Sequence, residues 1–113
     1  MTARAKKRAT IPKAKLEEMI ETATVDCYNE SEQATGWFTA LEDNVALPFE
    51  TTVLEVPVHV HRFDLTEREE IVAICVRGKS KQAVPILELP LPSPRPAGTE
   101  WIEAYRIWSS GSW

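Results

Sequence analysis

The chain lacks several features on which common protein functions depend. None of its apolar runs approaches the roughly 20 residues that a membrane-spanning helix needs, and its basic N-terminus carries no apolar signal segment. With four glycines in 113 residues it has no glycine-rich phosphate loop. It also has no Gly-x-Ser-x-Gly nucleophile elbow. We therefore expect a cytoplasmic protein that is not an enzyme and has no membrane partner.

Cysteine and histidine are scarce as well. Cys27 and Cys75 lie in apolar contexts, which is typical of buried thiols in a reducing compartment. A dyad of Cys27 with a histidine is the enzymatic alternative. His59 and His61 alternate along a predicted strand, but zinc needs four ligands and neither cysteine is near in sequence. We interpret the two histidines as residues on the outer face of an edge strand.

Basic residues are unevenly distributed along the chain. Six of the 13 lie in residues 1–15, where there is no acid, so the rest of the chain has seven bases against all 17 acids, a net charge of −10. So acidic a globular part attracts cations. We interpret residues 1–13 as a disordered basic arm. We do not expect nucleic-acid binding, because no aromatic interleaving or known motif accompanies the basic residues.

Apolar periodicity predicts two helices in the first half of the chain. The first covers residues 14–28, and its apolar stripe consists of Leu16, Met19, Ile20, Ala23 and Cys27. The second covers residues 30–46, with Asn29 as its cap and Glu32 three residues later. Gly36 within it indicates a kink or a close approach to another backbone. Pro48 ends the helix.

In the second half of the chain, apolar and polar residues first alternate as they do in β-strands, and a helical pattern follows. Strands are predicted at 51–54, 56–60, 71–76 and 82–89. Pro57 suggests that the strand at 56–60 lies at an edge of the sheet. The strand at 71–76 is apolar throughout, which is typical of a central strand. Thr99 caps a closing helix at 100–109. Its stripe of Trp101, Tyr105 and Trp108 is more typical of core than of a binding site. The expected fold is α+β: an N-terminal helical pair, a small antiparallel sheet and a closing C-terminal helix, as one domain over residues 14–109. Residues 110–113 are expected to form a disordered tail.

Residues 90–98 contain four prolines at alternating positions. Such a segment is typical either of a stiff connector or of a polyproline II ligand for a protein partner. The alternative function is therefore a non-enzymatic interaction module that uses this segment or a sheet edge.

Carboxylates are concentrated in residues 24–49, where calcium is the ion they suit best. Calcium takes six to eight oxygens, but no EF-hand loop is present, so separated segments must build a site. Asp26 and Glu30, four residues apart, share a face if the chain is helical through both. Glu42 and Asp43 diverge in a helix interior, but near the helix end unpaired carbonyls would complete half of a coordination shell. Alternatively, these acids only complement a helix N-terminus or face solvent.

Several motifs of this chain resemble the small bacterial calcium-binding proteins typified by CcbP. The resemblance covers roughly residues 20–108 and is most specific in the helical half. It rests on Asp26-Cys27-Tyr28-Asn29-Glu30, Glu32, Gly36-Trp37, Leu41-Glu42-Asp43-Asn44 and Pro48-Phe49, and more loosely on Val56 to Val60, Ala83 to Ile86 and the Trp101, Tyr105, Trp108 stripe. Cys27 departs from the pattern, which usually has a small residue there.

The resemblance implies an acidic protein without EF-hands that binds Ca²⁺ as a buffer or sensor. The ligands it implies are Asp43 first, then Glu42, with Asn44, Asp26, Glu30 and Glu32 less securely. A second, weaker site would involve the acidic connection that contains Asp64, Glu67, Glu69 and Glu70. A sensor also needs a surface for a protein partner, for which an exposed Trp37 or Trp113 is the only hint. The oligomeric state stays open.

Overall fold

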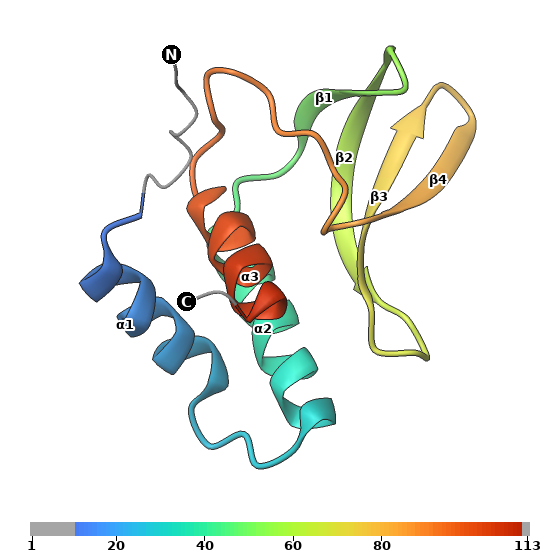
Figure 1. Ribbon diagram of the computed structural model, residues 1–113. Helices are drawn as coiled ribbons and strands as arrows, with labels where there is room; N and C mark the ends of the chain where they lie inside the picture. The colour runs from blue at the N-terminus through green and yellow to red at the C-terminus, as the bar shows by residue number, and fades with distance from the viewer. Residues whose placement is uncertain (1–10, 112–113) are drawn as a thin grey trace.

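The computed structural model describes residues 11–111 and has the expected α+β architecture (Figure 1). Two helices come first, then a four-stranded sheet, and a third helix closes the chain. In chain order the elements are α1 (Lys13–Thr24), α2 (Glu30–Asn44), β1 (Phe49–Val53), β2 (Val56–Leu65), β3 (Ile71–Arg77), β4 (Ser80–Pro85) and α3 (Glu100–Ser110).

Both ends of α2 follow from local chemistry. At its start, Asn29 accepts a hydrogen bond from the backbone N–H of Glu32 at 2.8 Å, while the Glu32 carboxylate accepts one from the N–H of Tyr28 at 2.6 Å. This reciprocal arrangement confirms the predicted start. The helix ends at Asn44, two residues before the predicted end, because Val45 is already extended. Similarly, α1 ends at Thr24 rather than at residue 28, and Asp26 in the connection has a positive φ of 60°.

The sheet is an antiparallel meander with strand order β1-β2-β3-β4. The prediction that β3 is a central strand is confirmed. The prediction that Pro57 marks an edge strand is wrong, because β2 lies between β1 and β3. Pro57 is tolerated because it stands near the start of β2, opposite Thr52 of β1, whereas the pairing with β3 begins only at His59. The missing N–H of proline is thus accommodated where one side of the strand is unpaired.

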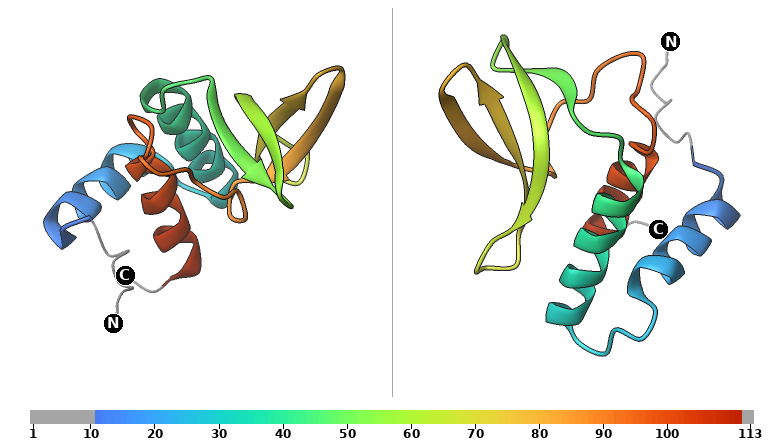
Figure 2. Two further views of the ribbon diagram at one scale, coloured as in Figure 1. Left: turned by 90° about the horizontal axis from the view of Figure 1, so that it is seen from above. Right: turned by 180° about the vertical axis from the view of Figure 1, so that it is seen from behind.

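The helices lie together on one side of the sheet (Figure 2). Helix α2 packs against β2, and α1 and α3 pack against α2 and against each other. Gly36 allows α1 and α2 to approach closely, since a Cβ atom there would lie 2.1 Å from the carbonyl oxygen of Ala23. The close approach indicated by this glycine is therefore confirmed.

The core is centred on Trp37, whose side chain is fully buried. Three aromatic rings of α3 surround it, with centroids 6.5 Å away for Trp101, 5.5 Å for Tyr105 and 5.6 Å for Trp108. The stripe on α3 thus packs against the core, as predicted, although its three rings are only half-buried. Because Trp37 is buried, the expectation that it exposes a partner surface is wrong. Trp113 lies outside the described residues.

The proline-rich segment follows β4 and returns the chain to α3 along the surface of the domain. Two hydrogen bonds connect this segment to the rest of the molecule. The hydroxyl of Thr51 donates to the carbonyl oxygen of Pro90 at 2.7 Å, and the N–H of Ala46 donates to the carbonyl oxygen of Ala97 at 2.9 Å. The guanidinium of Arg106 donates to the carbonyl oxygens of Ile86 and Leu89. Burial lowers the pKa of Arg106, an effect that the nearby Glu103 carboxylate opposes.

Most of the predicted basic arm lies outside the described residues, which begin at Ile11; Lys13 is already the first residue of α1. At the other end, α3 extends to Ser110, one residue into the predicted tail, and Gly111 follows it in a left-handed conformation. None of the helices found in residues 11–111 is long and apolar enough to cross a membrane.

Candidate metal centre

The structure divides the six predicted ligands into three groups, all exposed to solvent. Asp26 lies in the connection between α1 and α2, Glu30 and Glu32 lie in the first turn of α2, and Glu42, Asp43 and Asn44 form its last turn. From Glu30 to Glu42 the helix rises by about 18 Å. Calcium–oxygen bonds measure only about 2.3–2.6 Å. The two ends of α2 therefore do not share an ion, and the six residues do not form one site.

The group at the start of α2 has a structural role. Glu32 is engaged in capping the helix through the N–H of Tyr28, as described above. Both Glu30 and Glu32 also lie where the helix dipole favours negative charge. Asp26 is separated from Glu30 by non-helical backbone, so the shared helix face that their spacing allows does not form.

The group at the end of α2 combines side-chain and backbone oxygens. The N–H of Ala46 donates to Ala97 instead of to the carbonyl of Glu42, so that carbonyl lacks its usual helical donor. Asn44 donates through its side-chain amide to the carbonyl of Ala40 at 2.8 Å. Its own carbonyl packs against Gly98, where a Cβ atom would come within 1.8 Å of the oxygen. The segment at 97–98 thus fixes the backbone next to Glu42 and Asp43.

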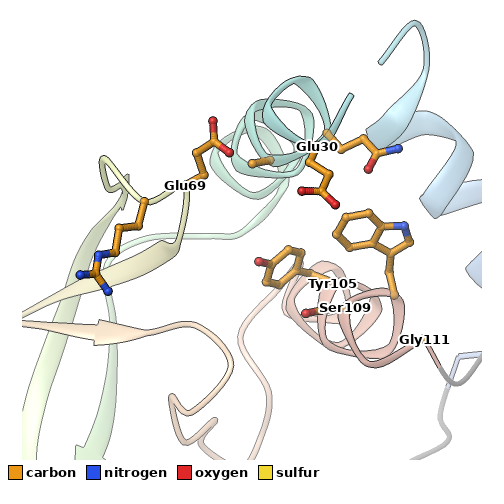
Figure 3. Close-up of a pocket in the computed structure, with 9 residues that line it drawn as sticks. Glu30, Glu69, Tyr105, Ser109 and Gly111 are labelled. Atoms are coloured by element: carbon orange, nitrogen blue, oxygen red, sulfur yellow. The ribbon is translucent and has the colours of Figure 1, made fainter. Parts of the chain in front are cut away.

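The start of α2 borders a second acidic location. A pocket of about 740 Å³ lies between α2, the connection from β2 to β3, and α3. Figure 3 shows Glu30 pointing from α2 toward Tyr105, with Glu69 of the connection beside it. The other residues that line the pocket are Gln33, Ala34, Arg68, Trp108, Ser109 and Gly111. The sequence singled out the acidic connection, but it did not indicate that Glu30 and this connection line the same pocket.

Tyr105, which lines this pocket, has surroundings that disfavour its ionised form. Burial raises the pKa of its phenol, and the negative charge of Glu70 raises it further. The two causes differ, but both shift the pKa in the same direction because each disfavours the phenolate. Burial similarly raises the pKa of the Cys75 thiol, which is 2% exposed. The prediction of a buried thiol is thus confirmed for Cys75 but wrong for Cys27, which is only half-buried.

We expect Glu70→Gln to lower the pKa of Tyr105, because the substitution removes a negative charge that opposes ionisation. Tyr28 and Tyr105 are the only tyrosines, so the Tyr28→Phe background isolates Tyr105 in an alkaline titration of tyrosinate absorbance. Glu67→Gln, on the same exposed connection, serves as the control. An unchanged or higher pKa in Glu70→Gln would show that Glu70 exerts no such field.

No group of three or more Asp, Glu, His or Cys side chains in residues 11–111 is arranged to hold a metal ion. A calcium site on this scaffold must therefore draw on backbone carbonyls, amide oxygens and water, or on rotation of exposed carboxylates. The donors at both ends of α2 are hard oxygens, which suits calcium and magnesium better than softer metals. The chemistry of the donor set thus fits calcium.

A family model described as calcium binding, the CcbP type, matches residues 17–109. The chain belongs to the CcbP calcium-binding family. The fold of this family member resembles the crystal structure of Anabaena CcbP, with a TM-score of 0.70 and 18% sequence identity over 97% of this chain and 96% of that one. It also resembles a calcium-binding protein solved in its calcium-binding form, with a TM-score of 0.68 and 17% identity over 87% and 91% of the two chains. A comparison with curated protein sequences gives no match.

Proposed function

We propose that this protein binds Ca²⁺ and that its principal site lies at the C-terminal end of α2. Membership in the calcium-binding family is the observation that carries the proposal. Asp43 supplies the central carboxylate and Glu42 a second one, while the amide of Asn44 and the carbonyl of Glu42 add neutral oxygens. Water completes the shell of six to eight ligands.

Three features support this position over the other end of the helix. Its acids are exposed and take no part in the capping bonds that engage Glu32. The carbonyl of Glu42 lacks its helical donor. The dipole at a helix C-terminus places partial negative charge on the unpaired carbonyls, which favours a cation. Glu30, with Glu69 across the pocket, offers a separate and weaker location.

Calcium buffering is the role we infer for this site. The excess of acids outside residues 1–15 concentrates cations near the domain. Adjacent carboxylates repel each other until an ion binds between them. A shell of flexible oxygens and water suits Ca²⁺ better than Mg²⁺, which requires a strict octahedron and releases its water reluctantly. A sensor would also have to expose a partner surface on binding, and Trp37, which the sequence suggested for such a surface, is fully buried.

The alternative, an interaction module based on residues 90–98, has less support. The segment is bound to the domain at Pro90 and Ala97, and Arg95 forms an ion pair with Glu103 at 2.8 Å. A ligand for a polyproline-recognising partner must present its prolines freely. A pull-down that persists in chelator and is lost when residues 90–98 are replaced would favour this alternative.

We expect the affinity for Ca²⁺ to fall at least tenfold in Asp43→Asn, because the substitution removes a charged ligand and keeps its shape. Isothermal calorimetry measures the change. Glu21→Gln removes the same charge from an exposed position on α1 and serves as the control for the general field of the protein. Glu30→Gln should leave the tighter binding event unchanged. Equal losses in Asp43→Asn and Glu21→Gln would show that the binding is a diffuse charge effect.

A further inference from the structure

The two histidines of the chain are exposed residues of β2 that alternate with buried valines, which places them on the face of the sheet opposite the core. Along β2, Val58 and Val60 point into the core, and His59 and His61 alternate with them and are exposed. The rings of the two histidines are neighbours, with centroids 6.4 Å apart and planes inclined at 62°. The strand thus presents two imidazoles side by side to solvent.

A carboxylate from the adjacent strand joins them. Glu50 of β1 is the register partner of His59. Its carboxylate oxygen lies 3.9 Å from Nε2 of His59, and both side chains are more than half exposed. The nearest guanidinium along β2, that of Arg62, is paired with Asp64 at 3.3 Å, which compensates its charge. Two imidazoles and one carboxylate therefore lie on one patch of the sheet, although in the positions observed they do not yet converge on a common point.

We propose that His59, His61 and Glu50 form a second metal site, which takes a borderline divalent transition metal such as Zn²⁺ or Ni²⁺. Imidazole is a preferred ligand of these ions, and two histidines with one carboxylate form an open ligand set in which water fills the remaining positions.

The site requires only small movements of exposed side chains. Two imidazoles on one zinc ion, each with a Zn–N bond of about 2.0–2.1 Å, bring their ring centroids to about 5 Å from each other. The observed centroid separation is 6.4 Å, so the rings must close by a little more than 1 Å. The bulge between Val60 and Arg62 leaves His61 outside the regular pairing with β3. Both rings are exposed on the surface, so such a movement does not disturb the core.

This site is independent of the calcium proposal. Calcium prefers oxygen ligands and the borderline metals prefer imidazole, so saturating Ca²⁺ should not displace a metal from the histidines. The two sites also lie on different elements, the calcium site on α2 and this one on β1 and β2. Either proposal can fail without affecting the other.

The experiment is a titration of the whole, untagged chain with Ni²⁺ in the presence of saturating Ca²⁺. We expect one saturable event at one ion per chain in calorimetry. His59→Asn and His61→Asn should each weaken it at least tenfold, the double variant should abolish it, and Glu50→Gln should weaken it several-fold. Cys27→Ser, which removes the more accessible thiol, should leave it unchanged.

Proton NMR adds a test that does not depend on affinity. The chain has two histidines, so the imidazole signals are few, and paramagnetic Ni²⁺ should broaden those of both rings at the same substoichiometric amounts. Broadening of one ring without the other, Ni²⁺ binding that survives in the double variant, or dependence of the event on Cys27 would each overturn the proposal.

Discussion

Trp37→Ala should destabilise the domain by about 3–5 kcal/mol, the usual cost of removing a large buried aromatic side chain. The Trp37 side chain is fully buried, and its ring contacts those of Trp101, Tyr105 and Trp108. Its removal leaves a cavity between α2 and α3, and the aromatic stripe of α3 loses the surface against which it packs. Since a domain of this size is stable by only about 5–15 kcal/mol, the variant should be largely unfolded at modestly raised temperature. Urea unfolding followed by circular dichroism measures the change.

Trp37→Phe is the informative companion. Phenylalanine keeps an aromatic ring in the cluster, and no residue within 11–111 accepts a hydrogen bond from the indole Nε1 of Trp37, so the substitution sacrifices no such bond there. We expect it to cost less than half as much as Trp37→Ala. Equal costs for the two variants would mean that the ring cluster is not what stabilises the packing of α3 on α2.

The second large effect is expected for Gly98→Ala, at about 2–5 kcal/mol. Gly98 has a φ of +84°, which an L-residue adopts at a cost of about 1–2 kcal/mol. In addition, a Cβ atom would lie 1.8 Å from the carbonyl oxygen of Asn44 and 2.6 Å from its carbonyl carbon. Both obstacles are backbone atoms that no side-chain rotation can move, so the connector must shift away from α2, which adds a further overpacking cost of about 1–3 kcal/mol.

Gly78→Ala separates the two contributions to this loss. Gly78 also has a positive φ, of +59°, but a Cβ atom there would meet nothing within 4 Å. It should therefore show only the conformational cost. The affinity for Ca²⁺ should fall in Gly98→Ala as well, because the shift displaces the backbone next to Glu42 and Asp43. Equal stabilities of the two variants would contradict the close approach of residue 98 to the end of α2.

Local chemistry made most of the elements predictable. The cap formed by Asn29 and Glu32, the apolar run of β3 and the aromatic spacing of α3 each act over a few residues, and each has its expected outcome in the structure. Pro57 led to the wrong prediction that β2 is an edge strand. Whether a proline is tolerated in an interior strand depends on where the neighbouring strand begins to pair, and β3 pairs with β2 only from His59 onward. Trp37 was misplaced for a similar reason, since its burial depends on the distant α3.

The candidate site could be predicted only in part. Sequence spacing placed Glu42, Asp43 and Asn44 at a helix end, and the structure confirms that they occupy the last turn of α2. The spacing did not reveal that residues 97 and 98 return to this end, or that Glu30 lines a pocket together with the connection between β2 and β3. These contacts join segments that lie about 40–50 residues apart, and no local pattern in the chain encodes such distances. Whether Asp43 and Glu42 bind calcium stays a prediction.

A crystal structure of the protein grown with calcium tests the central claim most directly. The account predicts an ion at the C-terminal end of α2, with a carboxylate oxygen of Asp43 at about 2.3–2.6 Å and further ligands from Glu42, backbone carbonyls and water. An ion bound only elsewhere, with the carboxylates of Glu42 and Asp43 in solvent at saturating calcium, would contradict it.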